Sequence, residues 1–471
     1  MAASVGRRDF LRVLLGGLAA ACTQALPRLS PGPPSTFRPT PGATTRPTPT
    51  SPPVADFIYV GRSILTMNPD RPRADALAVS GDRVLAIGDE AAVRAHEGPS
   101  TAVIDVSGAA ILPGFNDAHC HRIGDREVWG FETPEQAIAE TLRNGFTSIS
   151  ELFVNQDRLD ELVSLDRAGA LRLRVNAYLP VNYLEQRFGV WFGHLRPHAQ
   201  LSPRVRIGGV KAFADRAAPT KMLLTRDHAG QPGYQGDRYW APGELAAMVS
   251  ELHRNGWQVA IHTAGDAAHD MVLDALEDAL GGGPNEARHR IEHLMVLRDD
   301  QIERMAALGI VGSAQMSWFD SLWTEEYERD IIGSLDLIGR WRDLLDAGVP
   351  MIGSTDCPWD IPPIGPAMRA VADAVTRRGH DGPPPRAWQE RQRLTVEEAL
   401  RLLTAQGAWA TFEEADKGTL ETGKLADLVI LSEDPTTVPP EGLARVEALV
   451  TMIGGIAEYC AAGAEAFCPP D

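Results

Sequence analysis

The chain has 471 residues, of which 44% are hydrophobic and 23% are charged, an ordinary globular composition that can bury a large core and a smaller one beside it. Its formal net charge of −18 argues against nucleic acid or an anionic membrane surface as a partner, because both would require a basic patch. The charge places no constraint on the fold.

Residues 1–25 do not fit a folded domain and resemble a twin-arginine export signal. Arg7 and Arg8 precede a Gly- and Ala-rich apolar run that ends at Ala21, and this run is shorter than the roughly 20 residues that a membrane-spanning helix needs. The segment Ala19–Cys22 fits a small-residue cleavage site and, less closely, a lipobox. We therefore expect an extracytoplasmic protein, in the periplasm or at the cell surface, and leave open whether Cys22 carries a lipid that tethers it to the membrane. An arginine pair in an ordinary secretion signal is the alternative.

Residues 26–54 are rich in proline, threonine and serine and hold almost nothing apolar to bury. This composition predicts an extended, semi-rigid linker rather than a packed domain. Such a spacer behind Cys22 suits a tethered protein.

Both ends of the remaining chain have the pattern of short strands separated by glycine and aspartate turns. We expect one small β-sandwich domain formed from residues 55–108 and 415–471. Its strands are predicted at Asp56–Val60, Ser63–Met67, Ala76–Val79, Arg83–Ile87, Ala102–Asp105, Gly423–Leu431 and Val446–Met452.

Residues 109–414 alternate strand-like runs with helical patterns, and eight strands is the count of a TIM-type (β/α)8 barrel. The fold class is therefore α/β. The strands are predicted at 110–119, 146–151, 173–179, 206–213, 257–262, 289–293, 309–314 and 350–355. The helices are predicted at Pro134–Asn144, Pro242–Asn255, Ala267–Leu280, Arg298–Leu308, Leu335–Ala347 and Thr395–Gln406, the last opened by a capping box of Thr395 and Glu398.

Polar residues able to bind a metal stand at the ends of several of these barrel strands. His119 and His121 stand two residues apart after an apolar run, so both point to one face of a strand while Cys120 points away. Further groups follow in the order Lys211, His262, His293 and Asp356. A parallel barrel gathers its reactive groups at the carboxyl ends of its strands, so we expect these side chains to converge.

This order, together with the lead-in Pro113-Gly-Phe-Asn-Asp-Ala-His119, resembles the amidohydrolase superfamily of metal-dependent hydrolases from about residue 55 to the end. The segments 209–215, 262–266 and 290–293 resemble the branch, amidohydrolase family 3, that includes N-substituted formamide deformylases. Larger members of that branch carry a long insertion after the first strand. Here the second strand follows His121 within about 25 residues, so we expect a more open site.

The resemblance implies a divalent metal centre, with two zinc ions per chain bound by His119, His121, Lys211, His262, His293 and Asp356. Lys211 would serve as a carbamate that bridges the ions, because a protonated amine cannot be a ligand. A lysine in a salt bridge beside a one-metal site is the alternative. Asp356 would be the general base that takes the proton of the metal-activated water and passes it to the leaving amine.

Four other residues follow strand ends closely enough to contact a substrate or support the site: Asp266, Arg216, Trp318 and Trp359. Asp266 fits a role in orienting a loop better than a catalytic one. Near the C-terminus, Cys460 and Cys468 could pair in an oxidising compartment, and the sequence leaves this open.

The sequence therefore predicts an exported, metal-dependent hydrolase that cleaves an amide-like C–N bond in a small N-acyl, N-formyl or cyclic amide. A one-metal deaminase or an esterase or lactonase on the same scaffold is the enzyme alternative, since a fold does not fix a substrate. A surface binding lipoprotein is the alternative of a different class, although such a protein has no use for a proton shuttle at Asp356. The substrate and the oligomeric state are not determined.

Overall fold

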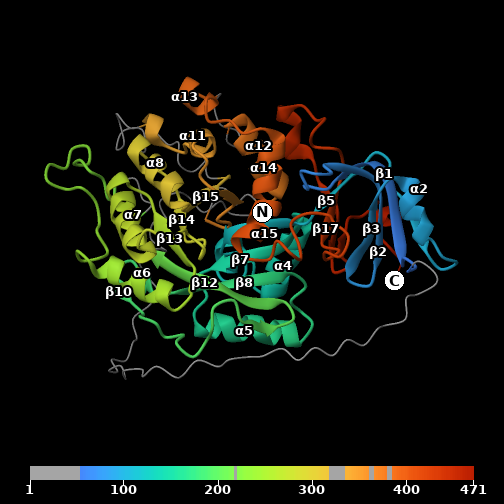
Figure 1. Ribbon diagram of the computed structural model, residues 1–471, viewed down its shortest axis with the longest axis horizontal. Helices are drawn as coiled ribbons and strands as arrows, with labels where there is room; N and C mark the ends of the chain where they lie inside the picture. The colour runs from blue at the N-terminus through green and yellow to red at the C-terminus, as the bar shows by residue number, and fades with distance from the viewer. Residues whose placement is uncertain (1–52, 217–219, 318–334, 360–364, 379–384, 471) are drawn as a thin grey trace, which may run out of the picture. The chain divides into compact units, whose positions relative to one another are not determined.

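The computed structural model describes residues 53–216, 220–317, 335–359, 365–378 and 385–470. In these ranges the chain ends form one small β domain and the middle forms a barrel of parallel strands covered by helices (Figure 1). The predicted export signal, Cys22 and nearly all of the linker lie outside the described residues. No helix within the described ranges combines the length and the apolar character that crossing a bilayer requires.

The small domain is one hydrogen-bonded sheet with strand order β19-β18-β17-β5-β1-β2-β3, in which β4 also pairs with β1. The two ends of the chain meet where β5 pairs antiparallel with β17. The strands are β1 (Phe57–Leu65), β2 (Arg73–Ser80), β3 (Arg83–Gly88), β4 (Ala102–Asp105), β5 (Ala110–Pro113), β17 (Leu428–Leu431), β18 (Ala448–Ile453) and β19 (Ile456–Cys460), with the short helix α2 (Glu90–Val93). Tyr59, Leu77, Ile430 and Val450 contribute to a core that belongs to this domain alone. Both chain ends contribute strands to this domain, as predicted, and the strands form a single hydrogen-bonded sheet where a β-sandwich was expected.

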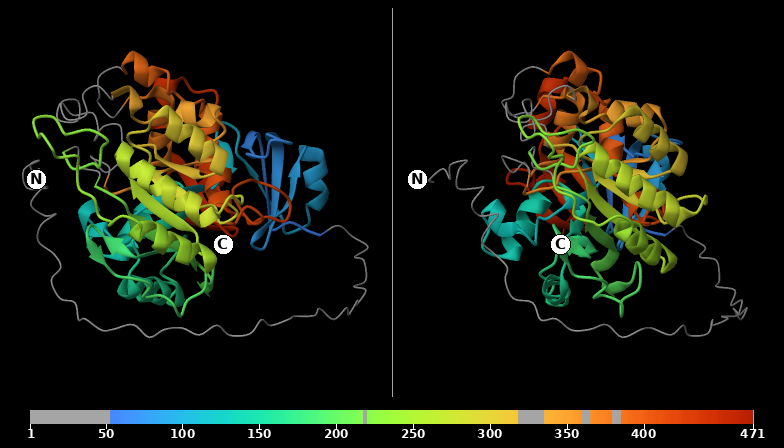
Figure 2. Two further views of the ribbon diagram at one scale, coloured as in Figure 1. Left: turned by 60° about the vertical axis from the view of Figure 1, so that its left-hand side comes forward. Right: turned by 90° about the vertical axis from the view of Figure 1, so that its left-hand side faces the viewer.

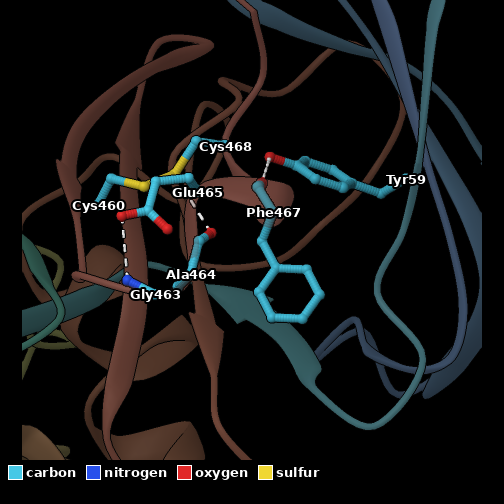
Figure 3. Close-up of a disulfide and its surroundings, with 7 residues drawn as sticks. All are labelled: Tyr59, Cys460, Gly463, Ala464, Glu465, Phe467 and Cys468. Carbon is cyan, nitrogen blue, oxygen red and sulfur yellow. Dashed lines mark hydrogen bonds between the residues drawn. A yellow bond between two sulfur atoms is a disulfide. The ribbon is translucent and has the colours of Figure 1, made fainter.

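The C-terminal tail is fastened to this domain at two points (Figure 3). A disulfide joins Cys460, at the end of β19, to Cys468. The Tyr59 hydroxyl donates a hydrogen bond to the carbonyl oxygen of Phe467 at 2.9 Å. The pairing that the sequence left open is therefore present.

The barrel consists of eight parallel strands in the order β6-β7-β8-β12-β13-β14-β15-β16. Its two end strands meet through backbone hydrogen bonds of 2.8 Å, from Asp356 N to His119 O and from His121 N to Cys357 O. The strands are β6 (Phe115–Cys120), β7 (Phe146–Leu152), β8 (Arg174–Pro180), β12 (Val205–Phe213), β13 (Val259–Thr263), β14 (Arg290–His293), β15 (Val311–Gln315) and β16 (Met351–Ser354). The predicted TIM-type barrel is confirmed, and the bonds that close it lie beside the predicted site residues.

Helices and short strands fill the connections of the barrel (Figure 2). The helices are α3 (Arg126–Trp129), α4 (Pro134–Arg143), α5 (Gln156–Arg167), α6 (Glu244–Arg254), α7 (Asp266–Leu280), α8 (Asp299–Leu308), α11 (Trp341–Asp346), α12 (Ala367–Thr376), α13 (Ala387–Glu390), α14 (Val396–Leu402) and α15 (Ala405–Ala410). The short strands are β9 (Asn182–Tyr183), β10 (Gln186–Arg187) and β11 (Gln200–Ser202). Helix α14 begins with the predicted capping box, in which Thr395 Oγ1 accepts from Glu398 N at 3.2 Å and the Glu398 carboxylate accepts from Thr395 N at 2.8 Å.

The structure corrects the predicted start of the barrel. The single strand predicted at 110–119 divides at Gly114 into β5, which joins the small sheet, and β6, which starts the barrel. A Cβ at Gly114 would lie 2.2 Å from the Thr147 side chain, so only glycine permits the close passage between the two sheets.

One further prediction on the elements was wrong, and some helices were not predicted. The strands predicted at Asp56–Val60 and Ser63–Met67 are one strand, β1, whose pairing with β2 continues past an irregularity between Val60 and Ile64. Helices α5 and α12 were not predicted. Helix α5 has charged residues on most of its surface and buries only Leu159 and Leu162 fully, so its apolar periodicity is weak.

Candidate active site

Three predicted residues converge at the carboxyl end of the barrel. Ligand atoms of His119, His293 and Asp356 all lie within 4.8 Å of one another, and this is the one such group found among the described residues. The His119 Nε2 atom lies 3.2 Å from Asp356 Oδ1, and the His293 Nδ1 atom lies 4.0 Å from Asp356 Oδ2. These side chains come from the ends of β6, β14 and β16 and are buried. Imidazole and carboxylate in this arrangement are suitable ligands for a divalent cation.

His121 and His262 extend the same cluster. The His121 Nε2 atom lies 3.4 Å from Asp356 Oδ1, so both histidines of the His-x-His motif face one carboxylate. Cys120 points the other way, with its Sγ atom 3.6 Å from the Ser150 carbonyl oxygen on β7. The ring of His262 lies 4.2 Å from that of His293, and its buried Nε2 atom has no hydrogen-bond partner among the described residues. A buried nitrogen without a partner is costly, and a metal ion would satisfy it.

Lys211 lies inside the cluster rather than in a salt bridge. Its Nζ atom is 3.4 Å from His119 Nε2, and no acidic group of the described residues lies within ion-pair distance of it. Burial lowers the pKa of Lys211 to about 8, although the negative charges of Glu292 and Asp356 act in the opposite direction. The described residues thus do not contain the salt bridge that was the alternative to a carbamate.

The protein environment keeps these groups in forms that can bind a metal. Burial holds the pKa of His262 well below its usual value, and the nearby charge of Lys211 adds to this effect, so the imidazole is neutral. Burial alone would raise the pKa of Asp356, but the charge of His119 and hydrogen bonds from His119 and His121 outweigh it, and the net direction is downward. Asp356 is therefore a carboxylate near neutral pH.

Two of the site residues have strained backbones. His293 has φ of 78° and Asp356 has φ of 61°, in the left-handed region that residues other than glycine seldom adopt. Each lies at or just beyond the end of its strand, where the turn re-aims the side chain toward the cluster. A strained backbone persists only where the surrounding structure stabilises it, and such residues cluster at functional sites.

A buried ion pair supports His119 from inside the barrel, and sequence reasoning missed it. The Glu292 Oε2 atom lies 2.6 Å from His119 Nδ1, and the Glu292 carboxylate also accepts from Arg290 Nε at 2.5 Å and from an Arg290 terminal nitrogen at 2.8 Å. This fixes the ring so that Nε2 faces the cluster. The segment Arg290-Ile-Glu-His293 contained the signal, since Arg290 and Glu292 alternate onto one face of β14.

Another pair of carboxylates holds the neighbouring segments. Asp117 accepts hydrogen bonds from Thr355 N at 2.9 Å and Thr355 Oγ1 at 2.5 Å, directly before Asp356. The Asp125 Oδ2 atom lies 3.7 Å from His121 Nδ1 and accepts from Trp359 Nε1 at 2.9 Å. Trp359 therefore reaches the site through Asp125, a residue that the sequence did not single out.

The other three predicted neighbours of the site have different placements. Asp266, at the start of α7, accepts from Thr225 N at 2.9 Å and lies 3.3 Å from Arg298 in an ion pair, so it holds a loop rather than joining the cluster. Arg216 is half-buried in the segment that follows β12. Trp318 lies outside the described residues.

A known protein family matches most of this chain. The sequence profile of the amidohydrolase family, Amidohydro_3, matches residues 133–456. The chain belongs to the amidohydrolase family. The match begins beyond His119 and His121, so the inclusion of those two residues in the candidate site rests on their distances to Asp356.

Individual relatives carry names of amide-cleaving enzymes. The chain is 29% identical over 261 residues to N-substituted formamide deformylase of Arthrobacter pascens, covering 54% of this chain and 46% of that one. It is 39% identical over 464 residues to N-acyl-D-aspartate deacylase of Alcaligenes xylosoxydans, covering 82% of this chain and 87% of that one. The chain spans about half the length of the first relatives that it matches, the deformylase included.

A solved structure shares the fold of this chain. An uncharacterized metal-dependent hydrolase from Pyrococcus horikoshii superimposes with a TM-score of 0.68 at 22% sequence identity. The superposition covers 82% of this chain and 99% of that one. At this identity the likeness shows the shared fold alone.

Proposed function

We propose that this amidohydrolase is a metal-dependent hydrolase that cleaves an amide-like C–N bond in a small N-acyl, N-formyl or cyclic amide. The observation that carries the proposal is the convergence of His119, His293 and Asp356 within 4.8 Å at the end of the barrel where such enzymes place their reactive groups. The names of the deformylase and the deacylase support the bond type.

The donor set fits a divalent cation. Buried imidazoles surround one carboxylate, and the His262 Nε2 atom lacks a hydrogen-bond partner among the described residues. We propose two zinc ions per chain, with ligands among His119, His121, Lys211, His262, His293 and Asp356. A bound divalent ion would supply Lewis-acid chemistry, lowering the pKa of a coordinated water from about 15.7 toward 7 and polarising the substrate carbonyl.

Asp356 is the proposed general base. Its carboxylate lies within 3.4 Å of the Nε2 atoms of both His119 and His121, at the point where the ligands meet. From there it would accept the proton of the attacking water and pass it to the leaving amine nitrogen. The buried position keeps bulk water from competing for that proton.

Lys211 is the proposed bridging ligand. Its amine is buried among the histidines with no carboxylate of the described residues paired to it. A neutral amine in that position can add carbon dioxide and release one proton to solvent, and the resulting carbamate anion offers two oxygen atoms. The side chain would then be an anionic ligand, whereas its protonated form would repel a metal ion.

We also propose that the protein works outside the cytoplasm. The support is the arginine pair and the short apolar run in residues 1–25, together with the Cys460–Cys468 disulfide. Disulfides persist chiefly in oxidising compartments. Attachment to the membrane through Cys22 is part of the proposal and would be tested by Cys22→Ala, which should release soluble, active enzyme.

The test combines metal analysis with a hydrolysis screen over N-acyl amino acids, formamides, dipeptides, hydantoins and lactones. Turnover of amides with metal bound supports the proposal. Turnover of lactones alone, deamination alone, or ligand binding with no turnover would each replace it with a different function.

Asp356→Asn tests the assigned base, because the amide has nearly the same shape and cannot accept the proton. We expect at least about 100-fold lower turnover with bound metal and fold retained. The control is Asp427→Asn, which removes a buried carboxylate that precedes β17 and pairs with Arg174 of β8 at 2.6 Å. This variant should lower stability and leave turnover intact. Native activity of Asp356→Asn across a pH series would reject the role.

A further inference from the structure

An aromatic wall stands beside the candidate metal centre. It consists of Phe153, Tyr183, Phe188 and Phe213, which follow or end β7, β9, β10 and β12. The ring centroids of Phe153 lie 5.6 Å from Tyr183, 6.1 Å from Phe188 and 6.2 Å from Phe213, and Tyr183 lies 5.6 Å from Phe213. All four contacts are edge-to-face, the arrangement that aromatic quadrupoles favour.

The aromatic wall is continuous with the site. The ring of Phe213 lies 5.2 Å from the ring of His262, and Lys211 Nζ lies 4.8 Å from the Phe213 centroid. The backbone of Phe213 is held by Asn182, whose Oδ1 accepts from Phe213 N at 2.9 Å and whose Nδ2 donates to Phe213 O at 3.0 Å. A fixed aromatic surface therefore lies directly beside the proposed metal ligands.

This surface is open at one end. Tyr183 is 39% exposed and is one of few large apolar side chains exposed among the described residues. Phe153, Phe188 and Phe213 are half-buried. Exposed aromatic area beside convergent polar groups is typical of a pocket that receives an apolar part of a ligand.

A positive charge follows the aromatic wall in the chain. Arg216 follows Phe213 by three residues, is half-buried, and makes no ion pair or hydrogen bond with the described residues. Burial raises the pKa of Tyr183, and the positive charge of Arg216 counteracts that effect. A partly buried guanidinium without an anion favours a ligand carboxylate, which it can bind through two hydrogen bonds.

We propose, on the basis of the amide hydrolysis proposed above, that the substrate is an N-acyl derivative of an aromatic amino acid. Its aromatic ring packs on the aromatic wall, its carboxylate pairs with Arg216, and its amide carbon lies at the metal ligands. The two contacts act on different parts of one substrate, so they can be separated by trimming the substrate.

The experiment compares kcat/KM for three substrates, with both enantiomers of the chiral ones. N-acetylphenylalanine carries both groups, N-acetylphenethylamine lacks the carboxylate, and N-acetylalanine lacks the ring. We expect each trimmed substrate to lose about tenfold or more, since a charged hydrogen bond and a packed ring each contribute at least that much. Equal kcat/KM for all three would overturn the proposal while leaving the proposed amide hydrolysis in place.

Variants of the proposed contact residues show which residue causes each loss in kcat/KM. Tyr183→Ala and Phe188→Ala should remove the preference for the ring and retain that for the carboxylate, whereas Arg216→Gln should do the reverse. Tyr459→Ala in β19 and Arg238→Gln on the surface are matched controls that should change neither preference. A uniform loss on all three substrates would show a structural role and overturn the proposal.

A binding measurement separates this proposal from the function on which it rests. A chelator first removes the metal, so that no turnover occurs. Titration calorimetry with N-acetylphenylalanine then measures binding to the aromatic wall and Arg216. If no amide is hydrolysed, the proposed function fails, and binding that weakens in both Tyr183→Ala and Arg216→Gln would still establish the subsite. Binding that neither variant weakens would overturn it.

Discussion

Replacing Glu292 with glutamine should weaken metal binding, because Glu292 orients the ring of His119. The substitution keeps the shape of the side chain but removes the charge that holds His119 Nδ1 at 2.6 Å and Arg290 at 2.5 and 2.8 Å. All three side chains are buried, so no water replaces the lost partner.

The expected magnitude follows from these contacts. Breaking a buried ion pair from one side costs about 3–5 kcal/mol of stability, because it leaves Arg290 charged in the barrel interior. Losing the group that orients a metal-binding histidine lowers metal affinity by about 10–100-fold. That range corresponds to roughly 1.4–2.8 kcal/mol of binding free energy.

The two effects are measured separately. Zinc affinity is obtained by competition with a chromophoric chelator, and stability by urea unfolding of the metal-free protein. The control is Glu413→Gln, which breaks the pair between the half-buried Glu413 and the buried Lys417, at 2.9 Å. It should lower stability and leave zinc affinity unchanged. If Glu292→Gln binds zinc as tightly as the wild type while both variants lose stability, Glu292 only supports the fold and the reasoning is refuted.

The pH dependence has a definite sign. Burial alone would raise the pKa of Glu292, but Arg290 and His119 outweigh it and hold the pKa well below its usual value. A carboxylate with a depressed pKa contributes stability above its unfolded pKa, near 4.3, and loses it as the pH falls toward the folded pKa. The stability gap between the wild type and Glu292→Gln should therefore be full above about pH 5 and shrink in more acidic solution.

Three more outcomes are expected. Lys211→Ala should lose one metal per chain and most activity, and added bicarbonate or a short carboxylic acid should restore part of it; full activity with unchanged metal content would establish a one-metal site. Replacing Arg7 and Arg8 together with lysine should leave the protein inside the cell, as cell fractionation would show, and continued export would point to the general secretion route. Thr395→Ala should cost about 1 kcal/mol in unfolding free energy through loss of the cap on α14, with metal content unchanged; an unchanged unfolding midpoint would show that the cap contributes nothing.

The sequence by itself determined the barrel, the β domain from both chain ends and the identity of the residues that cluster. These follow from local patterns. Apolar runs of strand length recur between helical periodicities, and each of Lys211, His262 and His293 stands at or near the end of such a run. Because parallel strands bring their carboxyl ends to one side, position along a strand was enough to predict that the side chains meet.

Only the tertiary structure decided how they meet. Glu292 supports His119 from 173 positions away in the chain, and the barrel closes through hydrogen bonds between the ends of β6 and β16. The division of one apolar run at Gly114 between two sheets, and the left-handed turns at His293 and Asp356, also lie beyond local patterns. Periodicity reports which face of a strand a side chain occupies, whereas its partner across the barrel depends on the register of all eight strands, which forms only when the barrel closes.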